Sequence, residues 1–160
     1  MMRLIKYWFV IPAVLAIVVI MALYTTTKRN NEAKELQEYR EYLLSLSAED
    51  VVVEYFKNRT EKNLPKIKET VIHEDRDTLK NNSNLEYVIA QEITVNEWET
   101  ARYIESLEGE DYLEAKVLDV TYEIKVKEII TQSDGVYTWC YWMIKKSEDE
   151  PWLVSEFGIP

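Results

Sequence analysis

The sequence predicts an α+β protein in which a transmembrane helix and a helical stalk precede two helices packed on a curved antiparallel sheet. Three observations support this prediction. An uncharged run covers residues 7–27, apolar residues recur at helical spacing up to residue 72, and from residue 84 the apolar period changes to two. Helices that come first and strands that follow favour a sheet with its helices on one face.

The uncharged run, residues 7–27, has the length of a membrane-spanning helix. At 1.5 Å per residue it extends roughly 31 Å, which is the thickness of the hydrocarbon of a bilayer. Tyr7 and Trp8 stand at one end and Tyr24 at the other, as in an interfacial aromatic belt. The run ends without a small-x-small cleavage site, so we expect an uncleaved anchor within residues 1–28.

The charges around this anchor favour a domain outside the cytoplasm. Only bases precede it, Arg3 and Lys6, whereas the bases that follow it alternate with glutamates that neutralise them. Long C-terminal domains also cross the membrane largely regardless of their charge. We therefore expect a single-pass protein of the cell membrane whose soluble domain is extracellular.

The chain beyond the anchor is strongly acidic. The first 29 residues hold four of the 19 lysines and arginines and none of the 29 acidic residues. A domain of this charge repels phosphate backbones, so nucleic-acid binding is not expected. Two interpretations of the charge stay open: it keeps the domain soluble, or it recruits a basic partner.

Residues 29–46 are expected to form the helical stalk, and residues 47–160 the domain. An apolar seam in the stalk has heptad spacing and can pack on the domain or on another copy: Leu36, Tyr39, Leu43 and Leu46. Ser47 is placed to cap the first helix of the domain, whose apolar side carries Tyr55 and Phe56. A shorter second helix follows, with a proline in its first turn.

A polar loop separates these helices from a run of antiparallel strands. Strands are expected at residues 85–95, 113–130, 136–146 and 152–157, whereas residues 96–109 suit either a ragged strand or a short helix. The second strand alternates most clearly, and one of its faces carries only apolar residues: Leu118, Val120, Tyr122, Ile124 and Val126. Such alternation is typical of a half-buried antiparallel strand with one wet face.

The strand at residues 136–146 is apolar on both faces. One face carries Val136, Thr138, Cys140, Trp142 and Ile144, and the other carries Tyr137, Trp139, Tyr141 and Met143. One alternative is that both faces are covered within one chain. We expect instead that the helices cover the face of Trp142 and Ile144. Tyr137, Trp139 and Tyr141 would then form a surface for a partner protein, a second copy or a ligand.

The first helix and the last strand of the domain carry a resemblance to a known family. The segment Ala-Glu-Asp-Val-Val-Val-Glu-Tyr-Phe-Lys-Asn-Arg-Thr-Glu-Lys-Asn resembles the first helix of NTF2-like, cystatin-like domains. In that family the aromatic pair, here Tyr55-Phe56, lies deep in a cone of helices on a curved sheet. The segment Pro-Trp-Leu-Val-Ser-Glu-Phe-Gly at residues 151–158 looks like the family's last strand.

The resemblance covers roughly residues 47–160 and is closest to small membrane-anchored or exported domains of Gram-positive bacteria. The acidic residue that the family often carries between its first two helices is absent, because Lys62-Asn63 stands there. A membrane helix followed by an NTF2-like domain is also the layout of scaffold subunits of bacterial secretion and conjugation channels. That likeness is an analogy of fold, which is weak evidence for function.

The sequence offers few groups for catalysis or metal binding. The only histidine, His73, has acidic neighbours, so it suits either a general base or a residue that stabilises the end of a helix. The acidic loops at residues 74–77 and 147–150 lack the glycine of a calcium loop, and one cysteine, Cys140, makes neither a disulfide nor a cysteine-rich metal site. We therefore expect no catalytic residue, no cofactor and no metal.

These observations predict a non-enzymatic, membrane-anchored domain of protein-binding or scaffold type. The alternative is a small-molecule-binding cone, a degenerate relative of the isomerases and dehydratases that the resemblance includes. A deep pocket lined by several convergent polar groups would favour the alternative. A closed cone with an aromatic outer sheet face would favour the first reading.

Overall fold

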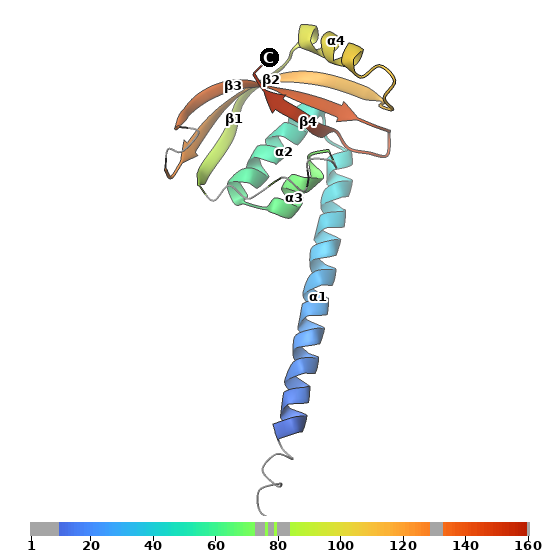
Figure 1. Ribbon diagram of the computed structural model, residues 1–160, viewed down its shortest axis with the longest axis vertical. Helices are drawn as coiled ribbons and strands as arrows, with labels where there is room; N and C mark the ends of the chain where they lie inside the picture. The colour runs from blue at the N-terminus through green and yellow to red at the C-terminus, as the bar shows by residue number, and fades with distance from the viewer. Residues whose placement is uncertain (1–9, 73–75, 77–78, 80–83, 129–132, 160) are drawn as a thin grey trace, which may run out of the picture. The chain divides into compact units, whose positions relative to one another are not determined.

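The computed structural model describes residues 10–72, 76, 79, 84–128 and 133–159 (Figure 1). Contacts divide the chain into two compact units, Met1–Glu38 and Tyr39–Pro160. A single helix, α1 (Val10–Leu44), runs through most of the first unit and begins the second. The helical stalk expected at residues 29–46 is part of this helix up to Leu44.

The predicted membrane anchor gains no support from the structure. Within the part of the chain that was described, no helix has both the length and the apolar content needed to cross a membrane. Residues 7–9 of the uncharged run lie outside the described residues, as does the basic tail with Arg3 and Lys6.

The second unit is an α+β domain, as predicted. Its sheet is a four-stranded antiparallel meander with the order β1-β2-β3-β4. The strands are β1 (Leu85–Val95), β2 (Glu114–Val126), β3 (Gly135–Lys145) and β4 (Leu153–Gly158). The alternation predicted for the second strand is confirmed, because the side chains from Leu118 to Val126 that were expected to share a face are all buried in the main core.

Two helices cover the inner face of this sheet: α2 (Ala48–Glu61) and α3 (Leu64–Glu69). Ser47 caps α2 by accepting a hydrogen bond from the backbone N–H of Asp50, and Lys62 ends the helix with a left-handed backbone at φ 58°. The side chains of Tyr55 and Phe56 are buried on the sheet side of α2. The cap and the apolar side predicted from the sequence are therefore confirmed.

A further helix, α4 (Glu97–Ser106), lies on the outer face, so that the sheet separates it from α2 and α3 (Figure 1). It forms from the segment that suited either a strand or a helix. Asn96 caps it by accepting from the backbone N–H of Glu99. Near β2 and β3 the sheet is therefore covered on both faces within one chain.

The two faces of β3 pack in the opposite way from the expectation, because α4 covers the outer face of the sheet. Tyr141 is 1% exposed and its ring lies 6.2 Å from that of Tyr55 and 5.5 Å from that of Phe56. Ile144 is buried on the other face, in a small cluster that includes Leu107, the residue directly after α4. The expectation that the helices α2 and α3 cover the Trp142 and Ile144 face was wrong, because α4 covers that face instead.

The end of α1 is part of the domain. Leu43 is fully buried, and Arg40 makes a bidentate ion pair with Glu69 of α3 at 2.6 and 2.9 Å. The Tyr39 hydroxyl accepts a 2.7 Å hydrogen bond from Asn58, and burial together with the charge of Glu54 raises the pKa of Tyr39. These contacts tie the last turns of α1 to both inner helices.

Candidate functional site

The three aromatic residues predicted to form a partner surface, Tyr137, Trp139 and Tyr141, differ in their exposure in the structure. Tyr141 is a core residue and is not available to a partner. Tyr137 and Trp139 are half-buried at the edge of the same inner face. Trp139 stacks on Phe157 of β4 at 6.1 Å and 15° between ring planes, and Phe157 is 45% exposed. We name Tyr137, Trp139 and Phe157 the concave aromatic patch, and its contact with a partner or a ligand stays a prediction.

The remaining candidates from the sequence are His73 and the acidic loops. His73 and its neighbours Glu74 and Asp75 lie outside the described residues. Across the described ranges no group of three or more His, Cys, Asp or Glu side chains could hold a metal ion.

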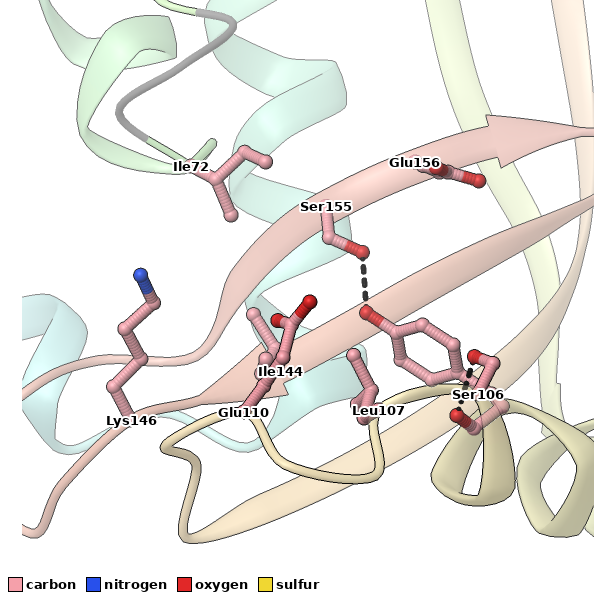
Figure 2. Close-up of a pocket in the computed structure, with 9 residues that line it drawn as sticks. Ile72, Ser106, Leu107, Glu110, Ile144, Lys146, Ser155 and Glu156 are labelled. Atoms are coloured by element: carbon pink, nitrogen blue, oxygen red, sulfur yellow. Dashed lines mark hydrogen bonds between the residues drawn. The ribbon is translucent and has the colours of Figure 1, made fainter.

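A groove of about 450 Å³ lies on the outer face of the sheet, where the end of α4 meets β3 and β4 (Figure 2). This size is within the usual range for sites that hold small ligands or side chains of a partner. Its walls come from four separate stretches of the chain: Ile72, Tyr103, Ser106, Leu107, Glu110, Ile144, Lys146, Ser155 and Glu156.

Hydrogen bonds to β2 fix the position of α4 and therefore of the groove. The backbone N–H of Asn96 donates to the carbonyl of Val117 at 2.8 Å, and the backbone N–H of Val117 donates to the Thr100 hydroxyl at 2.8 Å. The Asn96 side chain also donates to both carboxylate oxygens of Asp119, at 3.0 and 3.2 Å. These bonds hold the first turn, and buried Leu107 holds the other end.

A pair of hydroxyl groups forms the polar centre of the groove. The oxygens of Tyr103 and Ser155 lie 2.7 Å apart, and Ser155 donates to the backbone carbonyl of Trp142 at 3.2 Å. Because the single Ser155 proton is used there, Tyr103 donates to Ser155 and keeps its oxygen lone pairs as acceptors. Burial raises the pKa of Tyr103, the hydrogen bond shared with Ser155 lowers it, and the charges of Glu156 and Glu110 raise it further. The phenol is therefore neutral at physiological pH.

The rim of the groove carries more negative than positive charge. Glu110 and Glu156 supply two carboxylates, and Lys146 supplies one ammonium group. Figure 2 shows Lys146 and Glu156 at opposite sides of the groove, with Ile144 and Leu107 between them. No hydrogen bond or ion pair joins these three charged groups to one another within the described part of the chain. The groove thus combines apolar walls with an excess of acceptors.

This arrangement is suited to binding rather than to activating a nucleophile. The Ser155 hydroxyl donates to a backbone carbonyl and not to a base, so nothing withdraws its proton. The raised pKa of Tyr103 likewise keeps that oxygen protonated. What the groove offers a ligand is charge, acceptors and apolar surface.

A comparison with protein families identifies the domain that carries this groove. Residues 49–158 match the model of a domain of unknown function, DUF4829, which covers more than half of the chain. The chain belongs to the DUF4829 family. No curated protein and no solved structure matches the chain.

The residues of the groove in this DUF4829 domain were not anticipated from the sequence. Tyr103 and Glu110 lie in or next to the segment whose structure was ambiguous, and Ser155 and Glu156 were assigned only to a strand. One signal could have located α4. Asn96 is followed three residues later by Glu99, which is the spacing of a capping box.

The lone thiol of the DUF4829 domain lies beneath the start of α4. Cys140 is 1% exposed, and its Sγ donates to the Asp119 carboxylate at 3.1 Å. Burial, together with the hydrogen bond to Asp119 and its charge, raises the pKa of Cys140 to about 12. The thiol is therefore a structural donor that helps Asn96 to hold Asp119 in place.

We expect Cys140 to resist alkylation in the folded protein. A pKa raised from 9.0 to about 12 lowers the thiolate fraction near pH 8 about a thousandfold, and thiolate is the reactive form. Timed labelling with iodoacetamide at pH 8 gives the rate in buffer and the rate in denaturant, and the ratio of the two rates tests this expectation. Asp119→Asn is expected to label faster than the parent, because it removes the negative charge beside the sulfur. Native labelling as fast as that of the denatured chain would contradict the buried position.

Proposed function

We propose that this chain is a membrane-anchored, extracytoplasmic binding module that holds a partner protein and catalyses no reaction. The observation that carries the proposal is the outer-face groove, with its apolar walls, its unused acceptors and its excess negative charge. Hydroxyl groups without a base and carboxylates at a rim suit recognition better than chemistry. The partner would be basic, which fits the acidic composition of the whole domain.

The cellular setting of the proposal rests on the sequence. The uncharged run at residues 7–27 supports the anchor, and the basic residues before it support an extracellular domain. The α+β fold, with two helices on an antiparallel sheet, is compatible with an NTF2-like cone. A scaffold role beside a secretion or conjugation channel rests on that resemblance alone.

Site-specific crosslinking in intact cells tests the partner. A photoreactive amino acid at Ser106, which lines the groove, is expected to give one discrete protein adduct. The same group at Lys125, exposed on the sheet away from the groove, is the matched control and is expected to give little of that adduct. Loss of the Ser106 adduct on Glu110→Lys would tie the partner to the groove. Equal adducts from both positions would refute binding at this surface. The absence of an adduct from any surface position would refute binding of a protein.

Protease added to intact cells tests the orientation in the same cells. We expect digestion of the domain after α1, because the short basic tail before the run favours an outward-facing domain. A cytoplasmic protein that survives the treatment is the control for intact cells. Full protection of the domain would reverse the proposed topology.

A second candidate function is a small-molecule-binding domain, and the concave aromatic patch favours it. Trp139 and Phe157 are stacked, and nearly half of Phe157 is exposed at the edge strand β4. Flat rings that remain accessible can stack on a planar ligand. Quenching of Trp139 fluorescence by a ligand, lost in Phe157→Ala, would support this candidate.

A further inference from the structure

We propose that the outer-face groove is a lysine pocket, which takes the primary ammonium group and aliphatic stem of a lysine from an extended basic segment of the partner. The proposal rests on the partner-binding function above and specifies the chemistry of its site. It follows from three properties of the groove: its walls, its acceptors and the sign of its charge.

The walls suit an unbranched aliphatic stem. Leu107 and Ile144 are buried side chains of one apolar cluster, and Ile72 packs against that cluster from the opposite side of the groove. Figure 2 shows Ile72 facing the groove from across β4, while Ile144 and Leu107 lie beneath it. Lysine buries its methylene stem along such surface while its charged end reaches polar groups.

The acceptors suit the end of the lysine side chain. An ammonium group has three donors that diverge from one nitrogen. The groove offers acceptors on three different elements: the Tyr103 phenol on α4, Glu110 in the loop after α4, and Glu156 on β4. Arginine requires a coplanar pair of acceptors for its rigid fork, and acceptors that come from separate elements match it less well.

The third property gives the proposal a sharp test, because the rim carries charges of both signs. Glu110 attracts a bound cation, whereas Lys146 repels it. Neutralising each residue should therefore change the affinity in opposite directions. The substitutions Glu110→Gln and Lys146→Gln form a matched pair, since each removes one charge from the rim and leaves a polar side chain.

Methyl NMR of the full chain in a neutral detergent measures this binding. The isoleucine methyl groups report on position: Ile72 and Ile144 line the groove, and Ile89 is exposed on β1 as a spectator. The probes are acetyl-Ala-Lys-Ala-amide and its norleucine analogue, which keeps the stem and lacks the ammonium group. We expect the lysine peptide to shift Ile72 and Ile144 but not Ile89, and the norleucine peptide to bind at least about tenfold more weakly.

The charge variants complete the experiment. Glu110→Gln is expected to lower the affinity for the lysine peptide about fivefold, and Lys146→Gln to raise it about fivefold. Changes of this size are expected for one partly screened charge at a surface. A residue that only supports the fold would not produce changes of opposite sign. Unchanged Ile89 shifts in the free variants confirm that both remain folded.

Several results would overturn the proposal. Equal binding of the norleucine peptide, tighter binding of an arginine peptide, or changes of the same sign in the two variants would each exclude a lysine pocket. Silent Ile72 and Ile144 methyl groups with an intact crosslinked partner would exclude the pocket while the proposed function stands. Peptide shifts without any crosslinked partner would leave the pocket and refute the proposed function.

Discussion

Replacing Phe56 with alanine is expected to lower the free energy of unfolding of the domain by about 3–5 kcal/mol, enough to threaten a fold of this size. Phe56 is 1% exposed, and its ring lies 5.2 Å from that of Tyr122 and 5.5 Å from that of Tyr141. The substitution removes the side chain through which α2 meets both central strands. Large aromatic neighbours on both strands cannot close the space that it leaves, so a cavity adds to the lost burial.

A second variant on the same helix separates core packing from helix propensity. Val53 is 46% exposed, so Val53→Ala should change the stability by no more than about 0.5 kcal/mol. Urea unfolding of both variants, followed by circular dichroism, gives the two values. A loss of less than about 1 kcal/mol for Phe56→Ala would show that Phe56 does not belong to the core.

The sequence predicted best those elements that have one wet face. In β2 the apolar series from Leu118 to Val126 alternates with Asp119, Thr121, Glu123 and Lys125, and only one pairing of faces keeps the charged groups in water. The start of α2 was equally clear, because Ser47 is a good cap and an aromatic pair follows at the right spacing. In such elements the local pattern and the tertiary fold agree.

The sequence predicted less where an element is apolar on both sides. From Val136 to Ile144 neither face of β3 carries a charged side chain, so alternation could not tell which face α2 covers. The assignment of the two faces depended on whether another helix packs on the outer face of the sheet. The helix that covers the outer face is α4. Its Trp98 is 67% exposed and lies under the guanidinium of Arg102, so the apolar residues of this segment gave no clear helical stripe.

The groove could not be predicted from any local pattern. It joins residues that are far apart in the sequence, from Ile72 to Glu156, and only the packing of α4 on β2 and β3 brings them together. The charge balance of the chain gave a correct hint about the sign of the groove, but not about its place. Sites that arise between elements in this way leave no signature in spacing or motif.

Replacing Tyr141 with alanine is the other change with a large expected effect, and it tests which face of β3 is covered. Tyr141 is 1% exposed, its ring lies edge-on to those of Tyr55 and Phe56, and it stacks on Phe157 at 5.7 Å. We expect Tyr141→Ala to cost about 3–5 kcal/mol of stability, measured by urea unfolding.

Tyr137 provides the matched comparison, because it lies on the same face of the same strand, four positions before Tyr141. It is half-buried, and its hydroxyl is bonded to Ser133 in the adjoining turn. Tyr137→Ala should therefore cost only about 1–2 kcal/mol, since a half-exposed ring removes less apolar surface from water. Equal losses in the two variants would mean that α2 covers the whole inner face of β3, whereas a larger loss for Tyr137 would place Tyr141 toward solvent. A small loss for Tyr141→Ala, with a large one for Ile144→Ala, would restore the packing that the sequence first suggested, in which Tyr137, Trp139 and Tyr141 face a partner or a ligand.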